Sequence, residues 1–425
     1  MPALRAPRGT QDRLPEDAAS WERAEAAAAE LASRYGFERI ETPLFEATEL
    51  FVRGLGEGSD AVAKEMFGVR GAAGSDEEEP AWALRPEPTA GIVRAYLEHG
   101  LHVRPGPLRV WMMGPMFRYD RPQAGRFRQF TQWDVEVIGD PGPAVDAELI
   151  ELAGRYCAQV GLEDAVIHLN SIGDATCRPA YRAALVEYFT PHRDALGEDG
   201  RRRLNTNPLR VLDDKTLDPG LAAGAPKSID HLCDACQAHF AGVTGLLDRL
   251  GVAYQIDHRL VRGLDYYTRT TFELFPSGRT GSQDALAGGG RYDGLVELLG
   301  GPPTAGIGFG LGLDRIVLAM AQRGVPGEPT PALVAVVGTQ PDDVAERLLV
   351  AGALREAGLR VRPDGSDRKL GRQLEAAAKV GARWAVIVGE ELTRGSVVLR
   401  DLADGSQREI ALDQVAIATR GSSTR

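Results

Sequence analysis

The 425-residue sequence predicts a multidomain protein that joins an α+β part to an α/β part. Three patterns support this fold class. Residues 105–139 read as strand, polar loop and strand, residues 144–250 read as mainly helical, and residues 331–425 alternate strands with helices. Because 43% of the residues are hydrophobic, the chain can build the cores of two or three domains.

The N-terminal region is expected to begin with a helix and a strand. Residues 16–37, EDAASWERAEAAAAELASRYGF, have a helix-forming composition and an acidic start. Residues 38–46, ERIETPLFE, are typical of a strand entered by a proline. The small and acidic residues of GAAGSDEEEPAW at 71–82 predict a solvated loop.

An antiparallel hairpin is expected between residues 105 and 139. The apolar stretch GPLRVWMMGPMFRYD leads into the polar loop RPQAGRFR, and QFTQWDVEVIG follows. The last of these stretches alternates apolar with polar residues, which predicts a strand with one buried face and one face toward solvent.

The rest of the chain divides into an insertion, a linker and a second domain. Helical patterns dominate residues 144–250 with a break at TNPLRVLDDKTLDPGLAAGAP, so we expect a mainly helical insertion over about 170–255. The turn-rich GVPGEPTPA at 324–332 predicts a linker. The expected domains are therefore residues 1–325 and a compact α/β domain over residues 331–425.

Charge is distributed unevenly along the chain. The net charge is −11, but residues 331–425 hold 14 Lys+Arg and 13 Asp+Glu, a net charge of +1. The C-terminal domain is thus the part that repels an anionic partner least. The N-terminus has no signal-peptide pattern and the sequence has no run of eighteen apolar residues, so we expect a cytoplasmic protein without a membrane partner.

The four cysteines are too few for a disulfide framework in a chain of this size. Cys233 and Cys236 form a CDAC motif with His231 and His239 nearby, but no second CxxC motif supplies the other half of a zinc site. We therefore expect incidental cysteines on a helix and no metal site.

Two glycine-dense segments suggest phosphate binding at first sight, namely AGGGRYDG at 287–294 and GIGFGLGLDR at 306–315. The dinucleotide fingerprint fails because Leu311 stands where the third glycine is required, and the chain has no Gly-Lys pair for a P-loop. Neither common nucleotide fold is expected.

Arginine is the expected ligand for anions, because the chain has only five lysines and they lie far from the glycine-rich segments. Six arginines in or near the hairpin and the glycine-rich segments are candidates: Arg118, Arg121, Arg126, Arg128, Arg262 and Arg315. Each one alone could be an ordinary surface residue. Arg118 ends an apolar strand, Arg262 precedes a buried strand in RGLDYYTRTTFELF, and Arg315 begins an apolar helix, which favours one anion-binding pocket.

Several motifs together resemble those of the class II aminoacyl-tRNA synthetases. ERIETPLFE with Pro43 resembles motif 1, FRYDRPQAGRFRQFTQ resembles motif 2, and GIGFGLGLDRIVL resembles motif 3. LRPEPTA, RGLDYYTRT and AGGGRYDGL are similar to the histidine-specific blocks of the histidyl-tRNA synthetase family. The resemblance covers about residues 5–415, and the class I strings HIGH and KMSKS are absent.

The resemblance implies an antiparallel catalytic sheet with a helical insertion, a C-terminal α/β anticodon-binding domain and a homodimer. It implies a histidine–tRNA ligase that forms histidyl-adenylate from L-histidine and ATP, with Mg²⁺ on the ATP phosphates, and transfers histidine to tRNA(His). The strongest alternative is the synthetase-like regulatory subunit of ATP phosphoribosyltransferase, which is not catalytic. That subunit typically lacks the C-terminal domain and an intact RGLDYY block, both of which this chain keeps.

The resemblance also assigns roles at the ATP end of the site. Arg118 would hold the α-phosphate, and Arg262 would bridge that phosphate and the histidine carboxylate, which makes these two arginines the catalytic pair. Arg315 would hold the γ-phosphate and Phe130 would stack on adenine, with Asp120 and Arg126 completing the ATP-binding set.

For histidine, the resemblance assigns the amino group to Glu87, Thr89 and Gln132. The imidazole would contact Glu136 and Tyr267, with Tyr266 beside them. From the alternating strand alone, Glu136 would instead be a solvent-facing carboxylate.

tRNA contacts are assigned to two regions. Arg121, Gln123 and Arg128 would meet the acceptor end. The basic stretch SDRKLGRQLEAAAKVGAR at 366–383 would contact the anticodon side, although it could equally be a solvated helix face. Pro88, Thr131 and Asp120 depart from residues common in the family, and each lies beside a proposed site residue. Pro88 could shift the loop that presents Glu87 and Thr89.

Overall fold

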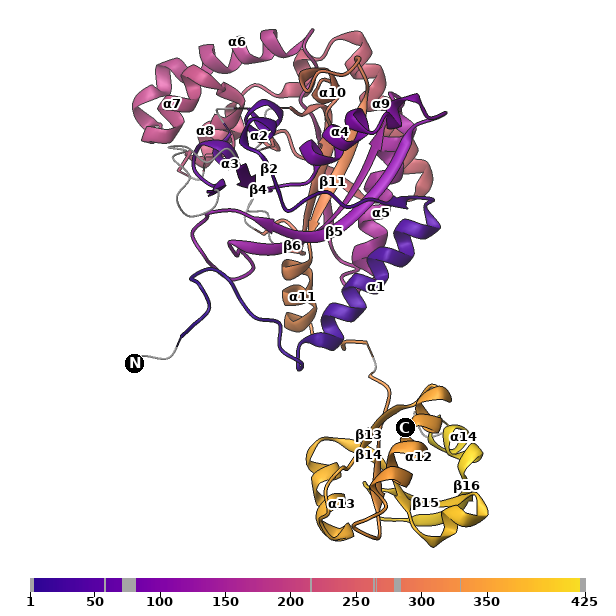
Figure 1. Cartoon of the computed structure of the whole chain (residues 1–425). Coiled ribbons are helices and arrows are strands. Elements are labelled where there is room, and N and C mark those ends of the chain that lie inside the picture. Colours follow the sequence, from indigo (N-terminus) through magenta and orange to yellow (C-terminus); the bar gives the residue numbers. More distant parts are fainter. Residues whose placement is uncertain are drawn as a thin grey trace. The chain divides into compact units, whose positions relative to one another are not determined.

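The computed structural model describes residues 4–56, 59–70, 82–214, 216–262, 264, 266–278, 284–328 and 330–420. It divides into two compact units, Met1–Glu328 and Pro329–Arg425 (Figure 1). This division falls inside the turn-rich segment 324–332. The loop expected at 71–82 lies outside the described residues, apart from Trp82, which begins a strand.

An eight-stranded sheet forms the centre of the first unit, in the order β1-β5-β6-β11-β10-β9-β7-β8. All neighbouring strands are antiparallel except the pairs β1–β5 and β7–β8. The bounds are β1 Glu38–Arg39, β5 Leu108–Phe117, β6 Gln129–Ile138, β7 Val166–Ser171, β8 Tyr254–Ile256, β9 Thr268–Phe275, β10 Ala287–Arg291 and β11 Gly306–Gly312. The predicted antiparallel sheet is confirmed.

The expected hairpin is β5 and β6, paired from Leu108 with Ile138 to Phe117 with Gln129. The prediction that one face of the second strand meets solvent is wrong, because every residue from Trp133 to Ile138 is buried. Alternation of polar and apolar residues marks a half-exposed strand only when one face meets water. Here both faces of β6 are covered, so the acidic residues in this strand are buried with their apolar neighbours.

Helices cover one face of the sheet. They are α1 Ala18–Arg34, α5 Pro143–Gln159, α9 Asp234–Leu250 and α11 Leu313–Gln322. Their apolar faces pack on the sheet through a core that includes Leu31, Trp133, Leu152 and Phe309. This face is closed by apolar packing, which leaves the opposite face for polar chemistry.

The opposite face of the sheet is lined by shorter elements. These are α2 Thr48–Leu55, α3 Asp60–Ala63, α4 Thr89–Glu98, η1 Leu101–Val103, α10 Leu295–Leu298 and a small sheet β2-β4-β3, with β2 Phe45–Ala47, β3 Phe67–Val69 and β4 Trp82–Leu84. A second core packs Phe51, Ile92 and Leu295 against β5 and Tyr292. Tyr266 and Tyr267 belong to this second core, so the histidine-block tyrosines lie on this face.

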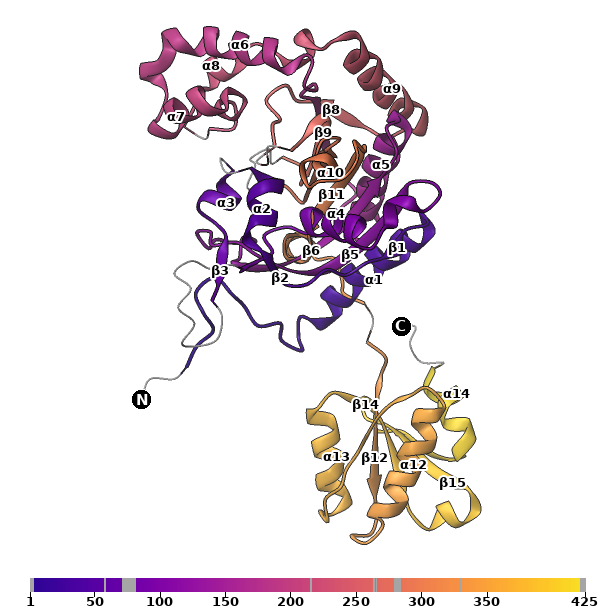
Figure 2. The ribbon, with the colours of Figure 1, turned by 45° about the horizontal axis from the view of Figure 1, so that its top comes forward.

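The segment expected to be mainly helical contains one strand that the sequence pattern did not reveal, β7, which runs between α5 and α6. After it come α6 Arg178–Phe189, η2 Thr190–Ala195, α7 Glu198–Thr206, η3 Pro208–Val211, α8 Pro219–Gly224, η4 Ser228–His231 and then α9. Figure 2 shows α6, α7 and α8 gathered together as a helical insertion. β7 was missed because VIHLNS is short and lies among strong helix formers.

The second unit is a five-stranded sheet in the order β13-β12-β14-β15-β16, with helices on both faces (Figure 2). α12 and α14 pack on one face around Val334 and Val386, and α13 packs on the other around Val337 and Ala377. The bounds are β12 Leu333–Gly338, α12 Val344–Glu356, β13 Arg360–Pro363, α13 Leu370–Lys379, β14 Ala382–Val388, η5 Glu390–Arg394, β15 Ser396–Asp401, β16 Gln407–Ala411, η6 Leu412–Gln414 and α14 Val415–Arg420. The predicted C-terminal α/β fold is confirmed. Among the described residues of both units, no helix combines the length and apolar character that a membrane span requires.

Candidate active site

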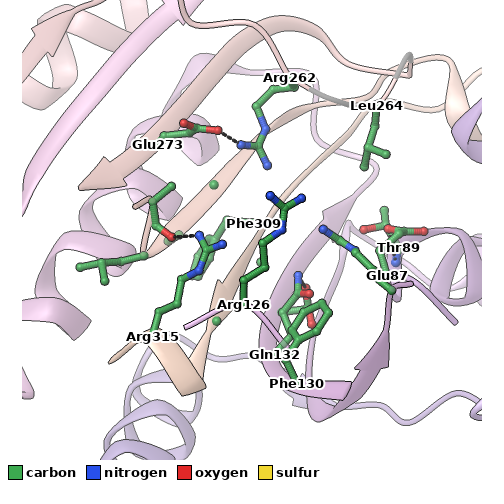
Figure 3. Close-up of a pocket in the computed structure, with 18 of the residues that line it drawn as sticks. Glu87, Thr89, Arg126, Phe130, Gln132, Arg262, Leu264, Glu273, Phe309 and Arg315 are labelled. Atoms are coloured by element: carbon green, nitrogen blue, oxygen red, sulfur yellow. Dashed lines mark hydrogen bonds and ion pairs between the residues drawn. The ribbon is translucent and has the colours of Figure 1, made fainter. Parts of the chain in front are cut away.

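A cavity of about 580 Å³ opens on the polar face of the central sheet. Its walls come from the start of α4, the β5–β6 hairpin, the segment before β9, and strands β10 and β11. Figure 3 shows its lining side chains, with Glu87 and Thr89 on one side and Arg126, Arg262 and Arg315 on the other. The cavity therefore has an acidic end and an arginine end.

Glycines form the floor of this cavity, which explains the glycine-dense segments. Gly308 of β11 pairs with Glu136 of β6, and a Cβ at this position would overlap with the Glu136 carboxylate. Gly288 of β10 pairs with Glu273 of β9, and a Cβ there would overlap with the Arg262 guanidinium. The glycines leave room for polar side chains to lie across the sheet, and this close approach is their function here.

The acidic end is organised around Glu136, whose side chain is buried with 2% exposure. The Thr89 hydroxyl donates to its Oε1 at 2.6 Å, and the Tyr292 hydroxyl donates to its Oε2 at 2.5 Å. Burial raises the pKa of Glu136 to about 8, against the lowering effect of those two hydroxyl groups. The solvent-facing interpretation of Glu136 is wrong, because β6 is covered on both faces.

Glu87 lies beside Glu136 and is held by the first turn of α4. Its carboxylate accepts the backbone N–H groups of Thr89 at 2.9 Å and Ala90 at 3.0 Å. These are N–H groups that a helix leaves unpaired at its start, so the helix fixes the carboxylate. Pro88 occupies the N-cap position of α4, and Glu87 and Thr89 both line the cavity beside it.

A third buried carboxylate, Asp134, completes the acidic end. Gln132 donates to its Oδ1 at 2.6 Å, whereas its Oδ2 accepts no hydrogen bond from the part of the chain that the structure describes. Burial, followed by the charges of Glu136 and Glu87, raises the pKa of Asp134 well above its ordinary value. Three carboxyl groups that repel one another in a buried pocket provide a strong reason to bind a cation.

Three tyrosines form the wall between the two ends. The rings of Tyr266 and Tyr267 lie 4.6 Å apart between centroids, and Tyr266 meets Tyr292 at 5.8 Å. All three are buried and line the cavity. Rings packed in this way present hydroxyl groups and flat apolar faces, which suits a small heteroaromatic ligand.

At the arginine end, Arg262 forms an ion pair with Glu273 (Figure 3). Burial would lower the pKa of Arg262, but the Glu273 carboxylate and the adjacent tyrosines raise it, so the guanidinium keeps its charge. Its Nε is buried and has no hydrogen-bond partner among the described residues. The ion pair therefore orients Arg262 and leaves donor capacity for a ligand.

Arg315, in the first turn of α11, points into the same space (Figure 3). Its Nε donates to the Gly125 carbonyl at 3.0 Å and its Nη1 donates to the Ala285 carbonyl at 2.5 Å. Burial and then the charges of Arg126 and Arg118 lower its pKa. Neutral carbonyls hold the guanidinium in place without cancelling its charge, so an incoming anion relieves the repulsion among these arginines.

The β5–β6 hairpin supplies the rest of this end. Arg118 donates from Nε to the Pro86 carbonyl at 2.9 Å, and its guanidinium carbon lies 5.3 Å from the centroid of the Phe130 ring. Arg126 is paired with Asp120. Arg118, Asp120, Arg126 and Phe130 all line the cavity, next to one another.

The residues predicted to meet the acceptor end do not line the cavity. Arg121 and Gln123 are exposed on the hairpin loop. Arg128 packs over the Tyr119 ring at 3.7 Å from its centroid, and its backbone N–H donates to Gly9 at 2.7 Å. Thr131, which departs from the family pattern, donates its backbone N–H to Asp314 at 2.7 Å and is not among the residues that line the cavity.

Sequence reasoning missed several residues that shape the cavity. Asp134, Glu273 and Tyr292 lie in segments that were quoted for other residues. A charged residue inside an otherwise apolar strand, as in WDVEVIG and FELF, was the available signal, because burying such a charge requires a partner. Asp199, Arg203, Asp213, Asp214 and Thr216 of the helical insertion also reach the cavity, and no local pattern indicated this.

The arrangement suits a ligand that has a cationic part and an anionic part, bound beside a second ligand that is an anion. A zwitterionic amino acid with a heteroaromatic side chain would place its ammonium and ring toward the buried carboxyls and tyrosines. Its carboxylate would then face the arginines, together with a polyphosphate. Such a site brings two anions together, which is the requirement for acyl-phosphate chemistry.

Family models match most of the chain. The model described as histidyl-tRNA synthetase matches residues 9–176 and 198–316, and the model described as anticodon binding domain matches residues 332–418.

Curated relatives and solved structures agree with those matches. The histidine–tRNA ligase of Pelotomaculum thermopropionicum is 47% identical over 414 residues, which is 96% of each chain, and that of Geobacillus kaustophilus is 45% identical over 421 residues, 97% of each. The crystal structure of apo S. aureus histidyl-tRNA synthetase is similar with a TM-score of 0.79 and 34% identity, covering 98% of this chain and 100% of that one. A structure titled as an ATP phosphoribosyltransferase regulatory subunit/histidyl-tRNA synthetase, from Bacillus halodurans, has a TM-score of 0.61 at 23% identity over 86% of this chain and 93% of that one, so it shows the fold alone.

Proposed function

The chain belongs to the histidyl-tRNA synthetase family and is a class II histidine–tRNA ligase, and on that premise we propose how its cavity activates histidine and delivers it to tRNA. The observation that supports the proposal is the separation of charge within one cavity. Glu87, Asp134 and Glu136 lie at one end. The other end holds the arginines, where the carboxyls of Glu273 and Asp120 are ion-paired with Arg262 and Arg126. A histidine molecule placed between them has a cation at the acidic end and an anion at the basic end.

The acidic end recognises the amino group and the imidazole. Glu87, Thr89 and Gln132 accept the ammonium, and the Thr89 hydroxyl can do so because it already donates its proton to Glu136. Glu136 and Tyr267 form hydrogen bonds with the imidazole nitrogens, and Tyr266 packs beside Tyr267. A pocket of buried polar groups rejects apolar amino acids of similar size, because those groups would lose their partners.

The arginine end holds ATP, which family membership implies as a substrate. Phe130 stacks on the adenine. Arg126 and Arg315 bind the phosphates that lie beyond the α-phosphate, which is the one that reacts. Asp120 orients Arg126 through their ion pair. Arg118, fixed on the Pro86 carbonyl, faces the α-phosphate from the hairpin side.

In the first step a carboxylate oxygen of histidine attacks the α-phosphorus, a new O–P bond forms, and the bond to the β-phosphate breaks to release pyrophosphate. The attacking group is already ionised, so the reaction requires no general base. The barrier is repulsion between two anions, which Arg118 and Arg262 offset from opposite sides. Glu273 keeps Arg262 charged and aimed.

Mg²⁺ is expected with the ATP phosphates, where it supplies additional positive charge to the departing pyrophosphate. Asp120 and Glu273 line the arginine end and offer the carboxylate oxygens that such an ion takes alongside phosphate oxygens. We assign no other protein ligand to it.

In the second step a hydroxyl of the terminal adenosine of tRNA(His) attacks the aminoacyl carbonyl, and AMP leaves. We assign Arg121 and Gln123, exposed on the hairpin loop, to the approach of the acceptor end. Arg128 supports the base of that loop through Tyr119 and Gly9, so its contribution to tRNA binding is indirect.

The second unit is assigned to the anticodon. A cavity of about 270 Å³ lies along the basic stretch 366–383, lined by Arg362, Arg368, Gln373 and Val380 among others. Gln373 is buried and bonded to both backbone groups of Gly338, so it serves the fold and not the tRNA. The exposed Arg362 and Arg368 are the side chains we assign to tRNA contacts.

Removal of this unit tests the assignment. A chain that ends near residue 325 should keep part of its histidine-dependent ATP–pyrophosphate exchange and lose most tRNA charging. Undiminished charging by that shortened chain would remove the anticodon assignment.

A homodimer and a cytoplasmic location complete the proposal. Leu44, Phe45 and Trp82 are exposed on and beside the small sheet β2-β4-β3 and next to the motif 1 proline, which gives a second copy an apolar surface. The described cysteines are all free thiols, as a reducing compartment would keep them. Molar mass in solution, measured by light scattering, tests the dimer.

Histidine-dependent ATP–pyrophosphate exchange, measured beside exchange with other amino acids, tests the cavity assignment. Exchange should require histidine and should fall sharply in Arg118→Ala, while Arg53→Ala on the exposed surface of α2 should leave it unchanged. If Arg118→Ala retained full exchange, the catalytic role of the hairpin arginine would be wrong.

A further inference from the structure

Three of the four cysteines converge with an aspartate at the base of the helical insertion. One carboxylate oxygen of Asp174 and the sulfurs of Cys177, Cys233 and Cys236 all lie within 4.8 Å of one another. Cys177 and Cys236 are buried, and Asp174 and Cys233 are half-buried. This cluster, called the Asp-Cys cluster below, is outside the active-site cavity and the proposed mechanism does not use it.

The spacing of the cluster is that of two zinc-binding pairs. Asp174 and Cys177 are separated by two residues and precede α6, and Cys233 and Cys236 have the same separation at the start of α9. The first pair is not a CxxC motif, because Asp174 occupies the position of its first cysteine. Two ligand pairs with this spacing are typical of structural zinc sites, and a carboxylate is an accepted zinc ligand.

The geometry requires little movement to surround an ion. Asp174 Oδ1 lies 3.6 Å from Cys177 Sγ and 4.0 Å from Cys233 Sγ. Zinc bonds of about 2.0–2.3 Å in a tetrahedron place ligand atoms roughly 3.4–3.8 Å apart. A small contraction of the cluster therefore gives a closed four-ligand shell with no position open to water.

Groups outside the cluster hold its ligands in place. Cys177 and Cys233 are the N-cap residues of α6 and α9, so the starts of these two helices fix the positions of two of the sulfurs. Arg269 donates to Asp174 Oδ2 at 3.4 Å, and the backbone N–H of Asp174 donates to Cys177 Sγ at 3.4 Å. Such partners orient ligands from outside the metal shell.

Backbone conformation is fitted to the same cluster. Gly173 has a φ of 66°, and a Cβ there would lie 2.5 Å from Cys177 Sγ. Arg269, with a φ of 49°, is the one residue other than glycine with a positive φ in the described chain, and its backbone N–H donates to Gly173 at 2.7 Å. An unfavourable conformation at Arg269 is maintained where it positions the loop that carries Asp174.

We infer that Asp174, Cys177, Cys233 and Cys236 bind one Zn²⁺ as a closed structural site. Three soft thiolates and one carboxylate in tetrahedral spacing select zinc over the hard cations Mg²⁺ and Ca²⁺. The site ties the loop before α6 to the loop before α9, so it closes the base of the insertion.

The zinc site would also support the histidine pocket from behind. Arg178, directly after Cys177, donates to the backbone carbonyl of Tyr267 at 2.5 Å and to that of Gly173 at 3.1 Å. Tyr267 is one of the two residues proposed above to bind the imidazole of histidine. Loss of the ion is therefore expected to lower the thermal stability of the full chain and to weaken histidine binding more than ATP binding.

Metal content of the purified full chain tests this inference. After growth with zinc and extensive desalting under reducing conditions, elemental analysis should find about one zinc per chain. Cys177→Ser and Cys236→Ser should lose it, while Cys157→Ser, a buried cysteine outside the cluster, should keep it. Chelation should lower the melting temperature of the parent and of Cys157→Ser but not of the two ligand variants.

Two further measurements keep the test decisive if the serine variants do not fold. Replacement of zinc by Co²⁺ should give the visible absorption of a tetrahedral thiolate site. Asp174→Cys should bind zinc more tightly, by roughly tenfold or more in competition with a chelator, because thiolate is the softer ligand.

Three results would overturn the inference. They are a metal-free chain even after refolding with zinc under reducing conditions, an unchanged zinc content in Cys177→Ser, and a mass lower by two hydrogens that shows a disulfide in place of the ion. None of these results bears on pyrophosphate exchange, so failure here is distinct from failure of the proposed function.

Discussion

The two ends of the active-site cavity carry opposite charges and are built in different ways. At the acidic end, side chains hold one another: Thr89 and Tyr292 both donate to Glu136, and the first turn of α4 fixes Glu87. At the arginine end, neutral backbone carbonyls hold Arg118 and Arg315, whereas Arg126 and Arg262 have ion-pair partners in Asp120 and Glu273.

The difference follows from what each end must do. Burial raises the pKa values of the carboxyl groups, so the acidic end holds its shape by hydrogen bonds and selects a ligand by matching donors and acceptors. Carbonyl partners leave the arginine charges uncancelled, so that end offers charge to the phosphates. One end is expected to determine substrate affinity, and the other is expected to determine rate.

Replacement of Arg262 should give the largest effect. Because its interaction strengthens as charge grows on the α-phosphate, Arg262→Lys and Arg262→His should slow single-turnover adenylate formation by about 10²–10³-fold, with smaller changes in affinity. Lysine should rescue poorly, since it keeps the charge but lacks the planar fork. Arg53→Lys on the surface of α2 is the matched control.

Transfer of histidine from preformed adenylate to tRNA should change less in these Arg262 variants. If adenylate formation ran at the parental rate and only transfer collapsed, Arg262 would belong to the tRNA step and the comparison between the two ends would fail.

Replacement of Glu136 should affect affinity. Glu136→Ala leaves the Thr89 and Tyr292 hydroxyls without their acceptor and removes the contact with the imidazole, so histidine should bind about 10–100-fold more weakly while ATP binding changes little. Calorimetry with each substrate measures this. Glu98→Ala at the exposed end of α4 is the control, and equal losses for both substrates would indicate a disrupted sheet instead.

A methyl group added to the cavity floor should reproduce part of that loss without removing a polar group. Gly308→Ala places a Cβ against the Glu136 carboxylate, so we expect roughly tenfold weaker histidine binding and an intact ATP site. Gly245→Ala on α9, where a Cβ meets nothing within 4 Å, should bind histidine normally. Normal binding by Gly308→Ala would show that the floor does not set the position of Glu136.

The smallest expected effect is a pH dependence. The pKa of Glu136 is raised to about 8, so at pH 7 most of this group is protonated and it ionises as the pH passes 8. If the ionised form accepts the imidazole N–H, histidine affinity should rise somewhat less than tenfold between pH 7 and about 8.5. Glu136→Gln should flatten this profile, and a profile with the same slope in both proteins would assign the titration to another group.

The same pKa predicts the direction of the stability change. Between the ordinary pKa of a glutamate and about 8, the folded state keeps a proton that the unfolded state has lost. Unfolding then releases a proton, so the contribution of Glu136 to stability falls as pH rises through that window. The denaturant midpoint of Glu136→Gln should fall less over the same range.

The sequence by itself determined the order of the motifs, the β5–β6 hairpin, the two-part architecture and the arginine set. These features are local, because a strand pattern, a run of turn residues or a motif can be recognised within a few tens of residues at most. Arg118 directly follows β5, Arg315 lies in the first turn of α11, and Arg262 lies in the segment before β9, so the strand and helix patterns were enough to single them out as candidates.

Only the tertiary structure decided what each polar group faces. The burial of Glu136 depends on elements that cover both faces of β6, and its bonds to Thr89 and Tyr292 join residues 47 and 156 positions apart. The partnership of Arg262 with Glu273 and the approach of the insertion to the cavity arise in the same way. The Asp-Cys cluster is the clearest case, because a sequence pattern specifies residue types at short spacing, whereas the fold brings two distant pairs within a few ångströms.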